Sequence, residues 1–348
     1  MVKRHFFAGV NAPSGFFSRF SDIASDKDCQ RKIYIKGGSG MGKSTIMKRI
    51  AERADTEGYS VDYFHCSSDS SSLDGVYIDG IKTAVIDATA PHNSDPVYPG
   101  VTGEIFNCAD FLDSAQVKEH KEEIIHLSEL KKEAFLRAYR YMSAAEFVLE
   151  DIADSYKSVL YLHGIDLEAE KLIRRYLPDI TMPKAGRLRR LFVSAVTAEG
   201  FENYTDTVFG ARSIVTVKGG YGTDILLKKI MQAALSRVFS VEAFYCPMAP
   251  ENKLEHIVIG DIKTVFTTYN HYHHYIGNDT VDLDEYLIKM PLDTDEAYSL
   301  ANSLLKQAIQ SFGEARAAHS FLENFYTPAM DFSALSEKSN ILIESIFK

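Results

Sequence analysis

Short apolar runs alternate with longer segments of helical periodicity through most of this chain. Residues 33–35 form one such run, and a glycine-rich stretch begins two residues later. Beyond it, apolar side chains recur every three or four residues until Gly58: Ile46, Met47, Ile50, Ala51 and Ala54. The run predicts a buried strand, and the spacing predicts an amphipathic helix.

Other segments extend this alternation. Apolar runs predict strands at residues 4–12, 60–66, 76–78 and 83–87, whereas residues 16–24 and 167–176 are expected to be helical. Residues 104–163 contain no Gly or Pro and place apolar side chains at helical spacing, which predicts two or three long helices. Strands that alternate with helices are typical of a mostly parallel α/β sheet.

A glycine-rich loop joins the first buried strand to its helix. Gly37 to Ser44 fits the pattern Gly-x-x-x-x-Gly-Lys-Ser, which in this setting is typical of a phosphate-binding P-loop (Walker A motif). Glycine lets the backbone N–H groups of such a loop converge on phosphate, and the helix N-terminus adds further donors. The loop therefore predicts ATP binding by Gly37, Gly38, Ser39, Gly40, Met41, Gly42, Lys43, Ser44 and Thr45.

The candidates for catalysis are Lys43, Asp87 and His92, and the candidates for metal binding are Ser44 and Asp87. Lys43 is expected to reach the β- and γ-phosphates, and the Ser44 hydroxyl to be a ligand of Mg²⁺. Asp87 ends an apolar strand and is the candidate Walker B acid, which holds Mg²⁺ or polarises the attacking water. The alternatives are that Asp87 only caps the next turn, or that Asp79 has this role.

A loop rich in turn residues follows Asp87. Within it, His92 and Asp95 are candidates for sensing the γ-phosphate or binding a substrate. The simpler interpretation is a surface loop shaped by its three prolines, Pro91, Pro96 and Pro99.

The second half of the chain repeats the pattern of the first. At nearly constant separation, residues 35–40 match 217–222, 60–66 match 240–246 and 80–83 match 261–264. Residues 4–12 also match 190–198, and residues 144–150 match 317–323. Such self-similarity indicates a duplicated unit. The two copies are expected to pack as an intramolecular pseudo-dimer.

The second copy lacks the residues that carry the nucleotide chemistry. In this alignment Gly42 is replaced by Asp224, Lys43 by Ile225, Ser44 by Leu226 and Asp87 by Thr268. A carboxylate near the phosphate position opposes anion binding. We therefore expect one live nucleotide site, in the first half, and a pseudo-site in the second.

The sequence leaves the role of two further groups of residues undecided. Four arginines of the second half are candidates for an arginine finger, although none is favoured over a solvated linker: Arg187, Arg189, Arg190 and Arg212. Residues 270–275 are rich in histidine, but no Cys or well-spaced acid near them in the sequence completes a tetrahedral metal site. A polar loop inherited from the repeat, with His273 in the place of His92, is the preferred interpretation.

The repeat and the loops together predict two tandem P-loop NTPase-like three-layer α/β domains with mostly parallel sheets, each with an α-helical subdomain. The expected organisation is an active α/β domain at residues 1–113, its helical subdomain at 114–186, a degenerate α/β domain at 187–288 and its helical subdomain at 289–348.

Composition narrows the class of partner. The 348 residues carry a net charge of −10 and a pI near 5.6, which makes nucleic-acid binding by bulk electrostatics unlikely. Four cysteines are too sparse for a disulfide scaffold, which indicates reduced thiols and a cytoplasmic location. No apolar run approaches the ~20 residues that span a bilayer, so no membrane association is expected.

The sequence resembles a family of bacterial tandem P-loop ATPases over nearly its whole length. The resemblance rests on the Gly37–Thr45 loop, the stretch Asp87-Ala-Thr-Ala-Pro-His92 with Asp95-Pro96 after it, the strand at residues 6–12 and the duplication. It implies ATP binding, hydrolysis and a cytoplasmic location, but it supplies no substrate. The second glycine-rich loop lacks the residues that a tandem ATPase with two working sites would have.

The leading functional hypothesis is a Mg²⁺-dependent ATPase with an unknown substrate or protein partner. The alternatives are a P-loop small-molecule kinase whose helical region closes as a lid, and a nucleotide-gated binding protein with little turnover. No Asn-Lys-x-Asp run that would recognise guanine is present, which favours ATP over GTP.

Overall fold

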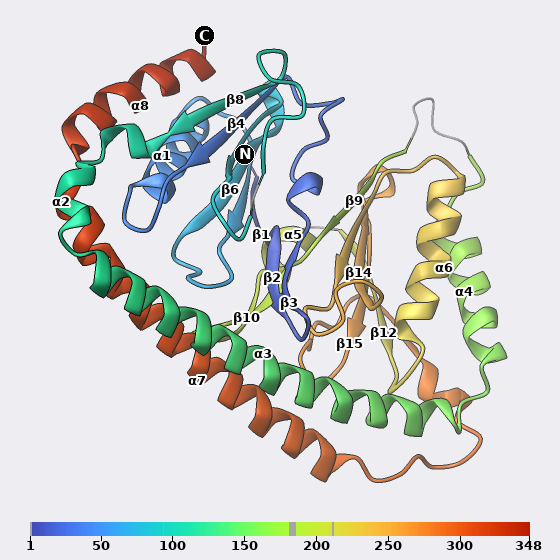
Figure 1. Ribbon diagram of the computed structural model, residues 1–348. Coiled ribbons are helices and arrows are strands. Elements are labelled where there is room, and N and C mark those ends of the chain that lie inside the picture. Colours follow the sequence, from blue (N-terminus) through green and yellow to red (C-terminus); the bar gives the residue numbers. More distant parts are fainter. Residues whose placement is uncertain (1, 93, 181–185, 211) are drawn as a thin grey trace. The chain divides into compact units, whose positions relative to one another are not determined.

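The computed structural model describes residues 2–92, 94–180, 186–210 and 212–348. The elements of the first half of the chain are β1 (Lys3–Phe7), β2 (Gly9–Ala12), β3 (Gly15–Ser18), β4 (Arg31–Lys36), α1 (Lys43–Thr56), β5 (Val61–His65), β6 (Leu73–Ile78), β7 (Thr83–Asp87), β8 (Gly103–Asn107), α2 (Ser114–Lys118), α3 (Lys121–Lys157) and α4 (His163–Tyr176). Short 3₁₀ turns join several of them. Figure 1 shows the helices and strands along the chain.

The second half contains a matching series. Its elements are β9 (Leu188–Leu191), β10 (Ser194–Thr197), β11 (Gly200–Asn203), α5 (Thr205–Phe209), β12 (Ser213–Lys218), α6 (Thr223–Ser236), β13 (Val241–Tyr245), β14 (Leu254–Ile259), β15 (Thr264–Tyr269), β16 (Asp279–Asp282), α7 (Asp295–Tyr326) and α8 (Phe332–Ile346).

Both halves build a six-stranded sheet with the same strand order. The first sheet runs β1-β5-β6-β7-β4-β8, and the second runs β9-β13-β14-β15-β12-β16. In each sheet the third strand, β6 or β14, is antiparallel to both of its neighbours, and the other described pairs are parallel. The protein is therefore an α/β protein with two mixed, mainly parallel sheets in two similar halves, as the repeat predicts.

Two sequence-based expectations are wrong. Residues 16–24 are not a helix, because β3 pairs with β2 in a hairpin and a 3₁₀ turn, η1 (Phe20–Asp22), follows. Gly15, with φ of 117°, allows the tight hairpin turn. The helical region expected from residue 104 begins instead with β8, since pairing with β4 along the sheet edge overrides the helical spacing there.

The chain divides into two compact units, and each unit contains segments of both halves. Unit 1 comprises Met1–Arg140, Ser194–Tyr204 and Gln307–Lys348, and unit 2 comprises Tyr141–Val193 and Thr205–Lys306. The β10–β11 hairpin and α8 thus belong to unit 1, although they come from the second half. Conversely, α4 of the first half belongs to unit 2, where it packs on α6.

Equivalent hydrogen bonds hold the exchanged segments in the two units. In unit 1, Asp113 N–H donates to the Ala329 carbonyl (2.8 Å) and Asp331 N–H donates to the Phe111 carbonyl (2.9 Å). In unit 2, Ile288 N–H donates to the Val159 carbonyl (2.8 Å), and Tyr161 N–H donates to the Tyr286 carbonyl (2.9 Å). The duplication has therefore produced a reciprocal exchange of C-terminal segments, of the kind seen in swapped dimers.

The core of unit 1 lies between the sheet and two helices. The apolar face predicted for residues 46–54 is buried on α1, and it packs with strand residues such as Ile33, Val76 and Val85. From α8, the buried side chains Leu335, Ile343 and Ile346 join the same cluster. A second-half helix thus completes the first-half core.

Two remaining properties concern the chain as a whole. Cys29, Cys66, Cys108 and Cys246 are free thiols. Within the described ranges, no helix combines the length and apolar character needed to cross a bilayer.

Candidate functional site

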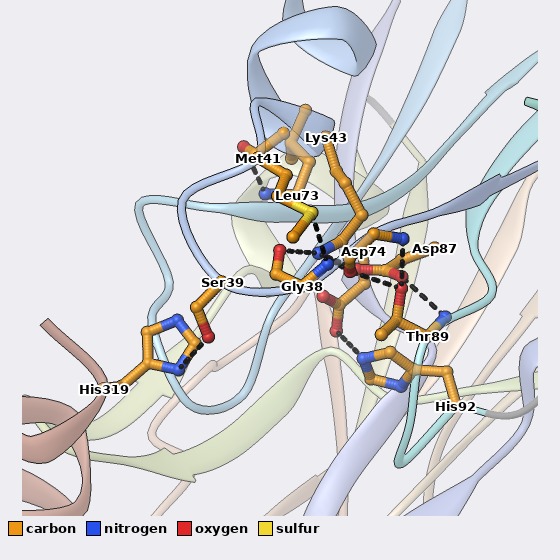
Figure 2. Close-up of polar contacts among 12 residues, drawn as sticks. Gly38, Ser39, Met41, Lys43, Leu73, Asp74, Asp87, Thr89, His92 and His319 are labelled. Atoms are coloured by element: carbon orange, nitrogen blue, oxygen red, sulfur yellow. Dashed lines mark hydrogen bonds and ion pairs between the residues drawn. The ribbon is translucent and has the colours of Figure 1, made fainter. Parts of the chain in front are cut away.

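The glycine-rich loop, residues 37–45, connects β4, which lies between β7 and the edge strand β8, to α1. Gly40 and Gly42 have φ angles of 70° and 80°, which side chains rarely adopt, and Gly42 is the N-cap of α1. Lys43 is the first residue of the helix, and its ammonium folds back onto the loop. It donates to the carbonyls of Gly37 (2.7 Å) and Gly38 (2.9 Å) (Figure 2).

Asp87 lies directly beside this loop because β7 pairs with β4. The register places Asp87 opposite Ile35, two residues before Gly37. Its Oδ2 atom is 3.6 Å from Lys43 Nζ, and its Oδ1 atom accepts from Thr89 N–H (2.8 Å) (Figure 2). Burial raises the pKa of Asp87, and the Lys43 charge offsets this only in part.

The rival acid Asp79 lies at the other end of the sheet. Because β6 is antiparallel to β7, the residue after Ile78 lies near Thr83 at the start of β7, away from the loop. Asp79 is paired there with Lys82 (2.6 Å).

Asp74 is a site residue that the sequence analysis missed. In the β5–β6 pair, Phe64 lies opposite Gly75 and His65 opposite Leu73, so Asp74 is the extra residue of a β-bulge. A bulge re-aims a side chain, and such bulges are frequent next to active sites. Asp74 Oδ2 is buried and has no hydrogen-bond partner among the described residues. The Ser44 hydroxyl lies next to this part of β6, because it accepts a hydrogen bond from the N–H of Leu73, the residue before Asp74 (3.0 Å).

His92 joins Asp74 and Asp87 in one buried cluster. One donor atom from each residue lies within 4.8 Å of the others, and His92 Nε2 is 3.6 Å from Asp74 Oδ2. The imidazole packs against the rings of Phe16 and Phe20. Burial alone would lower the pKa of His92, but the carboxylates of Asp74 and Asp87 outweigh it and raise that pKa.

The remaining loop residues have distinct environments. Met41 is buried, and its sulfur accepts from Gly38 N–H (2.9 Å), whereas Thr45 is exposed. Ser39 Oγ is 3.3 Å from His319 Nδ1 (Figure 2). Asp95, the other candidate in the loop after Asp87, is exposed and paired with Lys36 (2.6 Å).

Two basic side chains of α3 and α7, from the parts of these helices that belong to unit 1, lie near this loop. Lys131 of α3 donates to His319 Nδ1 of α7 (2.9 Å). Burial and the Lys43 charge lower the pKa of Lys131, although the nearby Cys66 and Glu323 act in the opposite direction. Burial, Lys131 and Lys43 together lower the pKa of His319 to about 4. Three basic groups are therefore crowded at one loop.

The second-half loop differs from the first in length as well as in sequence. Gly222 is the N-cap of α6 with φ of 87°, so it takes the place of Gly42, and the loop is shorter by two residues. The alignment from sequence is wrong at this point: Thr223 stands in the place of Lys43, and Asp224 in that of Ser44. The second copy therefore has no lysine in the place of Lys43 and no serine in the place of Ser44.

Other groups fill the second loop. Gly220 N–H donates to the Asp284 carboxylate (3.0 Å), and the Tyr156 ring occupies the space beside Gly220 that a Cβ would need. Thr268 pairs with Val217 as Asp87 pairs with Ile35, so the loss of the acid is confirmed by the strand register. The strand pairing also corrects the alignment of the repeat at one arginine. Arg4 pairs with Asp62 in the first sheet, and Arg189 pairs with Glu242 in the second, so Arg189 and not Arg190 corresponds to Arg4.

The arginines considered as finger residues all belong to unit 2, whereas the glycine-rich loop belongs to unit 1. Arg189 pairs with Glu242 (3.2 Å), and Arg212 donates to the carbonyls of Val208 and Phe209. Among the described basic residues of unit 1, Lys131 and His319 lie near the loop.

No protein-family model, no functionally curated protein and no solved structure matches this chain. The resemblance to tandem P-loop ATPases therefore stays a prediction from the motifs. The structure itself supplies the geometry from which a function is inferred.

Proposed function

We propose that the first half binds Mg-ATP at the glycine-rich loop and hydrolyses it, with the second half completing the site. The observation that carries this proposal is the crowding of Lys43, Lys131 and His319 at one loop of unit 1. The positive charges of Lys43 and Lys131 disfavour each other, and both disfavour protonation of His319. A polyphosphate would relieve this repulsion, because it would bring negative charge to the basic side of the loop.

The loop side chains have separate roles in this proposal. Lys43 exchanges its two loop carbonyls for phosphate oxygens, and the N–H groups of the loop and of the α1 N-terminus bind the phosphate chain. Lys131 and His319 stabilise negative charge on the transferred phosphoryl group, as an arginine finger would. His319 comes from α7, so a second-half segment serves the first-half site.

The oxygen donors beside the loop fit Mg²⁺. Ser44, Asp87 and Asp74 would hold the ion, either directly or through water, and hard oxygen ligands are what Mg²⁺ prefers. When bound, Mg²⁺ would neutralise charge on the phosphates. His92 acts as a positioning residue, because its ring stacks on Phe20 and its Nε2 lies 3.6 Å from the Asp74 carboxylate.

Turnover is tested by phosphate release from Mg-ATP. We expect steady release by the wild type without any added substrate, and loss of this release in Lys43→Ala. Lys48→Ala is the matched control, because Lys48 is an exposed lysine on the same helix. Release that appears only when a metabolite pool is added, with a phosphorylated product, would contradict hydrolysis and indicate a kinase.

The part played by α3 is tested separately. Lys131→Met should lower the rate of phosphate release about a hundredfold, because one preorganised charge next to the phosphoryl group is lost. Lys132→Met, which removes the adjacent exposed lysine, should have wild-type activity. Equal activity of the two variants would remove Lys131 from the proposed mechanism.

A further inference from the structure

The second half carries a buried cluster of two histidines and one glutamate in unit 2. Glu255 and His256 lie on β14, and His273 lies beyond the end of β15. One donor atom from each lies within 4.8 Å of the others, and His273 Nε2 is 3.0 Å from Glu255 Oε2. The three residues are 3%, 1% and 2% exposed, so the cluster is closed to bulk water.

A β-bulge brings neighbouring residues of one strand together. Side chains of adjacent residues normally point to opposite faces of a sheet. In the β13–β14 pair, however, Phe244 lies opposite His256 and Tyr245 opposite Leu254, so Glu255 is the extra residue of a bulge. Glu255 and His256 can therefore contribute donor atoms to the same cluster.

One ring nitrogen of His256 makes a hydrogen bond, and the other is in a position to bind a metal ion. Its Nδ1 is 2.7 Å from the Thr267 hydroxyl, which orients the ring. Its Nε2 is buried and has no hydrogen-bond partner among the described residues, and the same holds for the hydroxyl of Thr268. An orphaned nitrogen in a buried site is costly unless something binds it. In a metal-binding histidine, the ring nitrogen that does not bind the metal typically makes a hydrogen bond that orients the ring.

Comparison with the first half shows how this cluster differs from a Mg²⁺ site. Asp74 corresponds to Glu255 at the bulge, and His92 corresponds to His273. Gly75, opposite Phe64, is replaced by His256, opposite Phe244, and Asp87 is replaced by Thr268. One carboxylate is lost and one imidazole is gained. The donor set changes from one that suits Mg²⁺ to one that suits a softer ion.

We propose that Glu255, His256 and His273 bind a divalent transition-metal ion of the zinc class in unit 2. Two imidazoles and one carboxylate are a common protein ligand set for Zn²⁺. Donor atoms about 2.0 Å from such an ion lie roughly 3.3 Å from one another, so only small side-chain movements are needed. Any proton shared between His273 and Glu255 leaves to solvent when the ion binds.

The metal content of the purified full-length protein tests this site. After growth in zinc-supplemented medium and extensive dialysis, we expect close to one zinc per chain by mass spectrometry. His256→Gln and Glu255→Gln should each weaken zinc binding by roughly tenfold or more, because removing only a hydrogen-bond partner of a metal ligand already lowers metal affinity by that much. His274→Gln is the matched control, because His274 is an exposed histidine beside His273.

A second measurement does not depend on the variants. Wild-type protein refolded with Co²⁺ should show the visible absorption of a four-coordinate cobalt site, and added Zn²⁺ should abolish it. Absence of both zinc and this absorption would overturn the proposal and leave Glu255–His273 as a buried ion pair. Metal retained in His256→Gln, or lost equally in His274→Gln, would also overturn it. None of these readouts requires ATP binding.

Discussion

Asp74 owes its place in the site to a single extra residue in β6. The bulge lets a strand residue reach the Ser44 and Asp87 side of the loop, where its Oδ2 atom has no hydrogen-bond partner among the described residues. Carboxylates buried in this way are usually paired with a cation. At the residue scale, the two acids and Ser44 form the oxygen-rich side of the proposed site, and Lys43, Lys131 and His319 form its basic side.

Replacing Asp74 tests the oxygen-rich side. Asp74→Asn should raise the Mg²⁺ concentration needed for half-maximal ATP binding about tenfold, because one anionic oxygen is removed next to the ion. A magnesium titration at fixed ATP measures this effect. The control is Asp79→Asn, at the far end of β6, which should leave the magnesium requirement unchanged. An unchanged requirement in Asp74→Asn would exclude Asp74 as a ligand.

The pH dependence of stability tests the basic side. The pKa of His319 is about 4 in the folded protein, below its ordinary value of 6.5, because of burial, Lys131 and Lys43. Between pH 6.5 and 4 the unfolded chain therefore binds more protons at this residue, and stability falls as the pH falls. Mg-ATP should raise this pKa and weaken the fall.

Chemical denaturation at several pH values measures this effect. His319→Gln should flatten the decline between pH 6.5 and 4 relative to the wild type, both in the absence of nucleotide. An NMR titration of the His319 ring should give the pKa directly. A pKa near 6.5 without nucleotide, or one that nucleotide does not change, would contradict the proposed crowding of charge.

Some site residues could be predicted from sequence and others could not. Lys43, Ser44 and Asp87 follow from a local motif and from the end of an apolar strand, and the structure places them together. Asp74 depends on a bulge, which leaves no local sequence pattern, although the pairing of Asp74 with Glu255 in the repeat was an available signal. Lys131 and His319 depend on which helices cover the loop, and that is a long-range property.

At the element scale, the helix α8 distinguishes this fold from two independent domains. Leu335, Ile343 and Ile346 of α8 complete a core whose other members come from the first half. The stability of unit 1 should therefore depend on α8, which follows α1 by almost three hundred residues in the sequence.

Truncating one of these side chains tests that dependence. Leu335→Ala should lower the free energy of unfolding by about 2–4 kcal/mol, because a buried leucine is lost and a cavity is left. Ile341→Ala, at an exposed position of the same helix, should change it by less than about 0.5 kcal/mol. Urea denaturation followed by circular dichroism compares the two. A small effect of Leu335→Ala would mean that α8 does not belong to this core.

Predictions at the element scale succeeded where the signal is local. The apolar face of α1 and the strands around it follow from periodicity, and they are buried as expected. The β2–β3 hairpin was missed because two adjacent phenylalanines fit a helix as well as a strand. The residues aligned with Gly42, Lys43 and Ser44 were misplaced by two positions, since a two-residue deletion in a glycine-rich loop cannot be located from matching glycines alone.

At the scale of the whole molecule, the two similar halves differ at their glycine-rich loops. The two sheets share strand order, bulges and crossovers, yet one loop keeps the lysine and the other is filled by Tyr156 and Asp284. The repeat itself was readable from the sequence. The exchange of α4 and α8 between units was not, because a segment can pack on either copy of a duplicated core with the same local sequence.

The central claim is that one loop of the two binds nucleotide, and calorimetric titration with a hydrolysis-resistant Mg-ATP analogue tests it most directly. We predict one bound nucleotide per wild-type chain and the same for Lys48→Ala. Affinity should be weaker by roughly ten- to a hundredfold in Lys43→Ala, because a charge-assisted contact is lost. Two nucleotides per chain, none, or unchanged binding in Lys43→Ala would contradict the account.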